Sequence, residues 1–128
     1  METKTSFTQA HLENRLWANE LEFYREEIGI YQNHFENMIM DNERLQQSPD
    51  ADLFQNQLTR YEDQVNQLEN ELNTAENKMA IYAKAHATTD LDDVNVADHY
   101  SFKEKIERFK QEYQNLKNDF KRFEEANV

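Results

Sequence analysis

The chain has 128 residues, of which 26 are acidic and 14 basic, so its formal net charge is −12. The absence of cysteine excludes disulfides, thiolate zinc sites and cysteine nucleophiles, and a single glycine and a single proline argue against turn-rich β folds and glycine-rich phosphate-binding loops. The first residues contain no apolar core of a signal peptide, and no stretch approaches the ~18 apolar residues of a membrane span. We therefore expect one domain, residues 1–128, that is soluble, cytoplasmic and all-α.

Three long segments repeat an apolar residue at alternating intervals of three and four positions, the seam of a coiled coil or a helical bundle. The spacing predicts helices over residues 7–47, 49–87 and 98–126. Because residues at these seam positions face the interior, we expect an aromatic core. Its predicted members are Trp17, Phe35, Phe54, Phe109 and Phe120.

The two breaks between these helices are visible in the sequence. Ser48 is a typical N-cap, and Pro49 suits the first position of the helix that follows. So short a connection makes the first two helices antiparallel. A longer polar segment, about 87–98, separates the second helix from the third, and Asp98 is expected to cap the third. An elongated up-down-up three-helix bundle results, with a first helix about 60 Å long at 1.5 Å per residue.

Charge patterning provides a test of that topology. In a parallel helix pair, the g positions of one helix face the e positions of the other. Glutamates occupy g in the first helix and lysines occupy e in the third, so the two should be parallel neighbours. These positions are Glu13, Glu20 and Glu27 in the first helix, and Lys103, Lys110 and Lys117 in the third. On the other side, Arg25 is expected to meet Glu62 or Glu69 of the second helix.

The four histidines do not have the spacing of a metal site. No Glu-x-x-His motif occurs, and no His has a metal-binding partner four residues later on a helical face; the histidines are His11, His34, His86 and His99. No serine lies in a nucleophile turn. We therefore expect no metal, no cofactor and no enzymatic activity.

One end of the predicted bundle gathers histidines and aspartates. These residues are His86, Asp90, Asp92, Asp93, Asp98 and His99. One interpretation is a polar end layer, in which each imidazole is held by a neighbouring aspartate or backbone carbonyl. The other is a small-molecule or cation binder, or a pH-sensitive end, because clustered carboxylates affect a nearby imidazole.

The distribution of charge disfavours nucleic acid as a partner. Residues 1–98 carry 20 acidic and 7 basic side chains, and this excess repels phosphate. An acidic rod of this kind could instead imitate DNA and inhibit a nucleic-acid-binding protein. The alternative is that the negative charge only maintains solubility.

The first helix carries an additional apolar column on its outer face, at position c. It consists of Leu16, Phe23 and Ile30, with Leu12 one turn earlier, whereas the later helices have polar residues at this position. A row of large apolar residues on an outer face usually marks a contact surface. The column predicts a homodimer or a protein partner, unless it packs within the same chain.

Two stretches, Leu16 to Ile28 and Asp98 to Phe123, resemble a group of small helical bacterial proteins of no assigned function. A seam tryptophan, Trp17, is also similar to the one in spectrin-type three-helix repeats. The first resemblance implies a bacterial, cytoplasmic protein and brings no catalytic residues with it.

Overall fold

The computed structural model describes residues 6–85 and 97–127. It contains four helices, α1 (Phe7–Asp41), α2 (Glu43–Gln46), α3 (Pro49–Ala85) and α4 (Ala97–Ala126). The described ranges contain no strand, so the prediction of an all-helical chain is confirmed.

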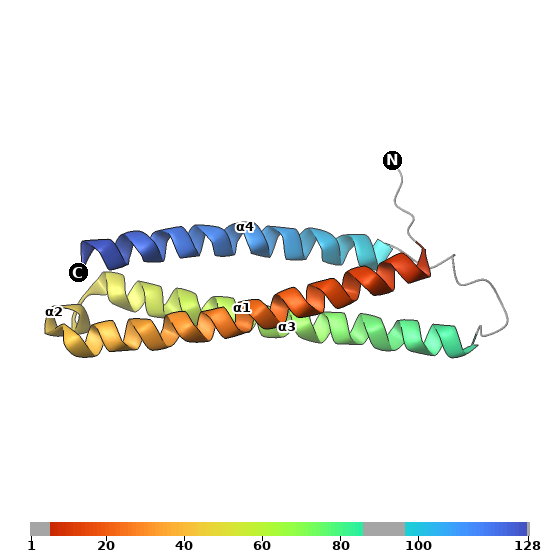
Figure 1. Ribbon diagram of the computed structural model, residues 1–128, viewed down its shortest axis with the longest axis horizontal. Helices are drawn as coiled ribbons and strands as arrows, with labels where there is room; N and C mark the ends of the chain where they lie inside the picture. The colour runs from red at the N-terminus through yellow and green to blue at the C-terminus, as the bar shows by residue number, and fades with distance from the viewer. Residues whose placement is uncertain (1–5, 86–96, 128) are drawn as a thin grey trace.

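The three long helices lie side by side in an elongated molecule (Figure 1). Cross-helix pairs give their directions. His11 pairs with Glu76 and Arg25 with Glu69, so α1 and α3 run in opposite directions. In the pairs between α1 and α4, the residue numbers increase along both helices in the same direction, so these two helices run parallel. These pairs are Glu20–Lys110, Glu27–Lys117 and His34–Glu124.

A break at Asn42 corrects the prediction of one continuous helix over residues 7–47. Asn42 has extended backbone angles, φ −140° and ψ 99°, so α1 ends at Asp41. Its Oδ1 accepts a hydrogen bond from the amide of Arg44 at 3.1 Å and caps α2. The short side chain of asparagine competes for backbone hydrogen bonds in this way and interrupts a helix. The break still leaves Leu45 in the core, at 3% exposure.

The predicted start of α3 is confirmed at residue level. Ser48 Oγ accepts a hydrogen bond from the amide of Ala51 at 3.4 Å, and Pro49 is the first helical residue. The expected cap of α4 is wrong, because the helix begins at Ala97 and includes Asp98 in its first turn. Alanine has the highest helix propensity, which favours extending the helix by this residue. The predicted end of the middle helix, 86–87, lies outside the described residues.

The core is aromatic along α4 and built from smaller residues between α1 and α3. Trp17, Phe35, Phe109 and Phe120 are buried, as predicted. Phe54 is only partly buried and packs against Phe123 at the edge of the core, with ring centroids 4.8 Å apart. The α1–α3 contact instead uses smaller side chains, so these two helices approach closely; its buried members include Ala10, Leu21, Ala51 and Val65.

The predicted charge columns meet. Lys110 Nζ lies 3.0 Å from Glu20 Oε2, and Lys117 Nζ lies 3.3 Å from Glu27 Oε1. Arg25 pairs with Glu69, one of its two expected partners. The first glutamate of the column, Glu13, contacts the imidazole of His99.

None of the described helices combines the length and the apolar character needed to cross a membrane.

Candidate functional site

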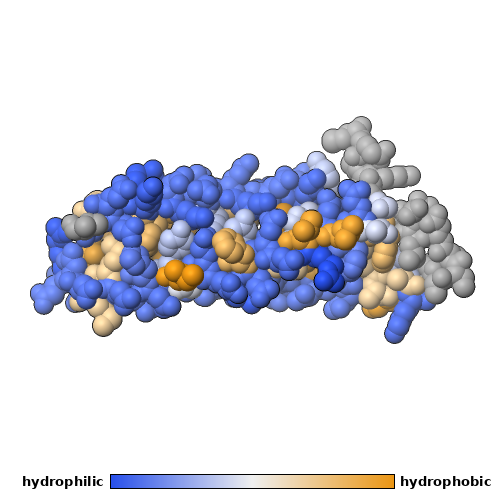
Figure 2. Space-filling view, in the orientation of Figure 1, coloured by the Kyte–Doolittle hydropathy of each residue, from blue (hydrophilic) through white to orange (hydrophobic). Residues whose placement is uncertain are grey.

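The apolar column on α1 lies on the outer surface of the molecule. Figure 2 shows hydrophobic side chains spaced along α1, surrounded by hydrophilic ones. More than half of each side chain in the column is exposed: Leu12 57%, Leu16 61%, Phe23 55% and Ile30 66%. Packing within the described part of the chain therefore does not cover the column.

The only glycine of the chain lies on α1, about 100° around the helix from the last residue of this column. Gly29 precedes Ile30 in the middle of α1, and its φ is not positive. A Cβ built on Gly29 would meet nothing within 4 Å. Glycine in a helix interior costs roughly 0.5–1 kcal/mol relative to alanine. Neither backbone strain nor crowding by the described residues requires this glycine, and it leaves the α1 surface accessible to another backbone.

The glutamates beside the column are largely neutralised by α4. Glu20 forms an ion pair with Lys110, and this carboxylate raises the pKa of the Lys110 ammonium. Glu27 accepts a hydrogen bond from Tyr113 Oη at 2.7 Å and also pairs with Lys117. Burial raises the pKa of the Tyr113 phenol, and the hydrogen bond to Glu27 raises it further. The border of the column toward α4 is therefore less acidic than the sequence of α1 alone indicates.

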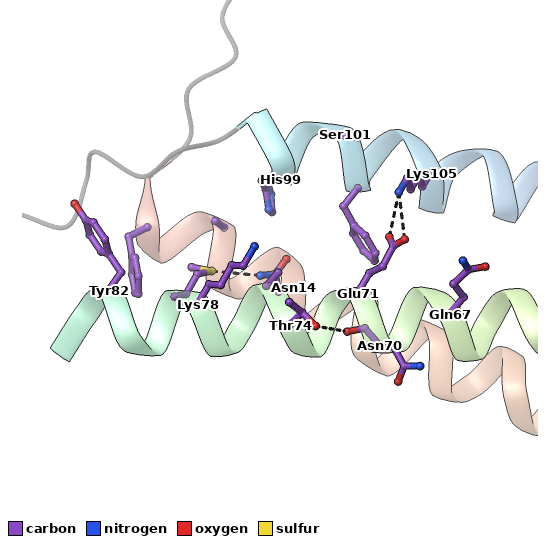
Figure 3. A pocket seen from close by; sticks show the side chains of 15 residues that line it. Asn14, Gln67, Asn70, Glu71, Thr74, Lys78, Tyr82, His99, Ser101 and Lys105 are labelled. Carbon is purple, nitrogen blue, oxygen red and sulfur yellow. Dashed lines mark hydrogen bonds and ion pairs between the residues drawn. The ribbon is translucent and has the colours of Figure 1, made fainter. Parts of the chain in front are cut away.

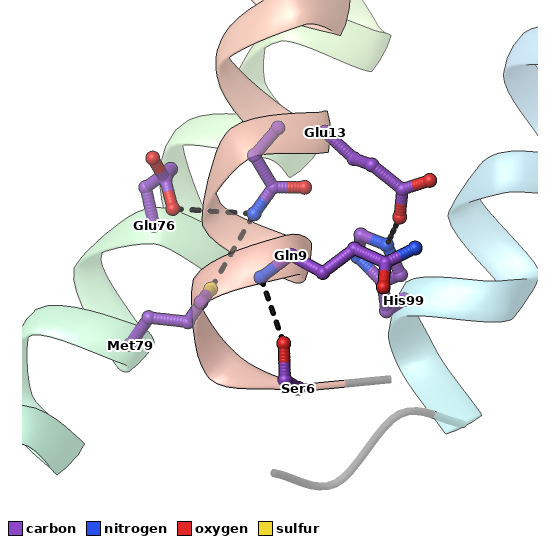
Figure 4. Close-up of polar contacts among 7 residues, drawn as sticks. Ser6, Gln9, Glu13, Glu76, Met79 and His99 are labelled. Carbon is purple, nitrogen blue, oxygen red and sulfur yellow. Dashed lines mark hydrogen bonds and ion pairs between the residues drawn. The ribbon is translucent and has the colours of Figure 1, made fainter. Parts of the chain in front are cut away.

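The predicted polar end is only partly described. His86, Asp90, Asp92 and Asp93 lie outside the described residues. His99 is positioned by α1: its Nε2 lies 2.6 Å from Glu13 Oε1, and its ring lies 4.9 Å from that of Trp17 (Figure 4). A glutamate of another helix is thus one partner of this imidazole.

A polar cluster between α1 and α3 lies at the same end of the molecule. Asn14 occupies a seam position and is only 2% exposed. Its Nδ2 donates to Glu76 Oε2 at 3.2 Å and to Met79 Sδ at 3.4 Å (Figure 4). His11 Nδ1 lies 3.0 Å from Glu76 Oε1. A buried seam asparagine with such partners favours one register between two helices.

A pocket of about 770 Å³ opens beside this cluster, between α3, the start of α4 and the start of α1 (Figure 3). Its apolar walls are Phe7, Ala10, Ala75, Met79 and Phe102. Polar side chains, including Lys78, His99 and Lys105, lie around them. His99, a member of the predicted end site, lines this pocket.

Residue size explains where the pocket forms. Along most of α4, aromatic rings fill the space toward the other helices; Phe109, for example, lies 5.9 Å from Tyr61 between ring centroids. Near the start of α4 the facing residues are smaller, Ala10 on α1 and Thr74 and Ala75 on α3. The sequence analysis missed this pocket, although the two alanines at seam positions were a signal.

An ion pair forms one boundary of the pocket. Lys105 Nζ of α4 lies 3.2 and 3.3 Å from the two carboxylate oxygens of Glu71 of α3 (Figure 3). Beyond this pair, a second cavity of about 360 Å³ lies between the same helices, lined by Leu68 and Phe109 among others. The Glu71–Lys105 pair lines both cavities and divides the groove between α3 and α4.

By class, the described residues form an all-helical protein with two candidate binding surfaces, the α1 column and the α3–α4 pocket. Among these residues, no group of three or more His, Asp or Glu side chains is placed to hold a metal ion. Comparison of the chain with protein-family models, with curated proteins and with solved structures finds no match.

Proposed function

We propose that the chain is a non-enzymatic protein-interaction module that forms a homodimer through the apolar column of α1. In this proposal the scaffold is an elongated up-down-up three-helix bundle with heptad packing, and α1 provides the contact face. The observation that carries the proposal is the exposure of Leu12, Leu16, Phe23 and Ile30 on one face, at 55–66% each.

The energetics favour two copies meeting on this face. Burying a Leu, Ile or Phe side chain stabilises a contact by about 1.5–3 kcal/mol. A two-fold axis doubles the four side chains of the column, so eight are partly buried. Their sum is comparable with the entropic cost of association, about 4–15 kcal/mol. Gly29 supports the same proposal, because it permits close approach of the second α1 helix.

Although the net charge of the chain is −12, the electrostatic repulsion between two copies is reduced at the proposed contact. Two α1 helices would bring Glu20 and Glu27 of each copy near those of the other. Lys110 and Lys117 already pair with these glutamates within each chain. The repulsion across the two-fold axis is reduced accordingly.

The experiment is light scattering coupled to size-exclusion chromatography over a range of protein concentrations. We expect a dimer for the unaltered chain and a folded monomer for Phe23→Glu, because a charge at the centre of the contact would be buried without a partner. Ile81→Glu is the matched control, since Ile81 is 69% exposed on α3, outside the column. A monomer at high micromolar concentration, or equal dissociation by both variants, would refute the dimer.

A specific observation favours a second candidate function, the binding of a small molecule. The pocket lies near the start of α4, where His99 lines it, and its volume of about 770 Å³ suits a ligand site. This function belongs to a different class and uses a different surface from the dimer contact.

A further inference from the structure

The interior of the α3–α4 pocket is suited to an apolar ligand. Its walls combine two aromatic rings, two alanines and a thioether, and the volume lies within the range of roughly 300–1,000 Å³ for small-molecule sites. Water against these apolar walls has few polar partners and is readily displaced by an apolar group, whereas polar side chains such as Asn70, Thr74 and Ser101 line the rest of the pocket. The lining therefore favours a hydrocarbon or an aromatic group.

The charged groups of the pocket favour an anion. Its charged lining residues are Lys78, Lys105 and Glu71, an excess of one positive charge in a chain of net charge −12. Glu71 is already bound by Lys105. Lys78, by contrast, makes no ion pair or hydrogen bond with any residue in the described ranges 6–85 and 97–127. Both ammonium groups face the space between α3 and α4 (Figure 3).

The boundary of the pocket limits the size of the ligand. The Glu71–Lys105 pair crosses from α3 to α4 and separates the pocket from the smaller cavity beyond it. A helix about 10–12 Å in diameter does not fit such a space, and an extended peptide could not continue along the groove without breaking the ion pair. The geometry therefore favours a small molecule over a protein segment.

We propose that this pocket binds an amphipathic carboxylate, a fatty acid of medium chain length. Its hydrocarbon tail lies against Phe7, Ala75 and Phe102, and its carboxylate pairs with the ammonium group of Lys78. This site is separate from the dimer contact, because the column lies on the outer face of α1, whereas Ala10 and Asn14, which line the pocket, are buried on the inner face of that helix.

The only tryptophan of the chain provides the readout. Trp17 does not line the pocket, but its ring centroid lies 4.9 Å from that of His99 and 5.3 Å from that of Phe102, which both do. Titration with sodium dodecanoate below its micelle concentration at pH 8 is expected to change Trp17 fluorescence in a saturable manner. Isothermal calorimetry on the same samples gives the stoichiometry, expected to be one per chain.

Three variants test the location of the site. Lys78→Gln is expected to weaken dodecanoate binding about tenfold, the loss of one charge-assisted contact. Lys84→Gln, an exposed lysine of the same helix that does not line the pocket, is the matched control and should leave the affinity unchanged. Ala75→Leu fills part of the pocket and should weaken binding at least tenfold. Circular dichroism verifies that each variant is folded.

Several outcomes would overturn the proposal. Absence of saturable binding to the unaltered chain is one. Equal affinity for dodecanoate and dodecanol, together with no effect of Lys78→Gln, would exclude the carboxylate contact. Binding that survives Ala75→Leu but is lost in Phe23→Glu would place the ligand on the α1 column. Failure of the proposed dimer does not affect this test, since the titration can be performed on either oligomeric state.

Discussion

At the scale of single residues, stability is concentrated in aromatic rings that α4 directs toward the other helices. Phe109 is 3% exposed, and its ring contacts those of Tyr24, Tyr61 and Tyr113. Truncation would leave a cavity that rigid neighbouring rings cannot fill. The burial of Phe109 was predictable from its seam position, whereas the partial exposure of Phe54 follows from its place beside Phe123 at the edge of the core, which periodicity does not describe.

We expect Phe109→Ala to lower the free energy of unfolding by about 3–5 kcal/mol. Urea denaturation followed by circular dichroism measures this loss. Lys121→Ala, at an exposed position of the same helix, should change stability by no more than about 0.5 kcal/mol. A denaturation midpoint that is similar in the two variants would contradict the assignment of Phe109 to the core.

The raised pKa of Tyr113 predicts how the free energy of unfolding changes at alkaline pH. Burial and the hydrogen bond to Glu27 raise its pKa in the folded chain, so the unfolded chain loses this proton first, near pH 10. The contribution of Tyr113 is complete below that pH and decreases as the pH rises above it, by up to about 1.4 kcal/mol per pH unit. Denaturation at pH 8 and pH 11 should show a smaller decrease for Tyr113→Phe than for the unaltered chain. Tyr100→Phe, at an exposed tyrosine, should not reduce the decrease.

At the scale of elements, the sequence contains the strong boundary signals but not the weak ones. Ser48 and Pro49 mark the start of α3, because a cap and a fixed φ act locally. The break at Asn42 was not predictable from periodicity, since Leu45 keeps the apolar spacing across it. The pocket was missed for a related reason: it depends on the space that the small residues Ala10 of α1 and Ala75 of α3 leave beside α4, and this space exists only after the helices pack.

Replacing Gly29 tests both the stability of α1 and its role in the proposed dimer. Gly29→Ala should raise the free energy of unfolding of the monomer by about 0.5–1 kcal/mol, because nothing in the described chain opposes the added Cβ. The same change should weaken the proposed dimer, since it obstructs the approach of a second helix. Asn56→Ala, at an exposed position of α3 away from the column, is the control and should leave association unchanged. Ultracentrifugation measures the dissociation constant, and a tighter dimer for Gly29→Ala would argue against close backbone contact there.

At the scale of the whole molecule, Lys110 and Lys117 of α4 contribute both to the alignment of α4 with α1 and to the proposed dimer. Each exposed pair contributes only about 0–1 kcal/mol to stability, so Lys110→Gln with Lys117→Gln should leave the chain folded. Their loss exposes Glu20 and Glu27 beside the column, and the dimer should weaken. Adding salt should then strengthen it, because the Debye length is about 10 Å at 0.1 M and shorter above.

Lys105→Gln provides the comparison for that double variant. It also removes one positive charge, but its partner Glu71 lies on α3, away from the column. Light scattering at low and at high salt should show little effect of this substitution on the dimer. Equal weakening by Lys105→Gln would mean that overall charge, rather than the α1–α4 pairs, governs association.

The direction of the three long helices also determines how the molecule would respond to mechanical tension. The described chain begins at Ser6 at one end of the rod and finishes at Asn127 at the other (Figure 1). A pulling force on these two points acts along the helix axes and loads the ring contacts between α1 and α4 in shear. Many such contacts, among them Tyr24–Phe109 and Tyr31–Phe120, would have to slip together rather than open one by one. We therefore expect α1 and α4 to separate in one step when force is applied between Ser6 and Asn127.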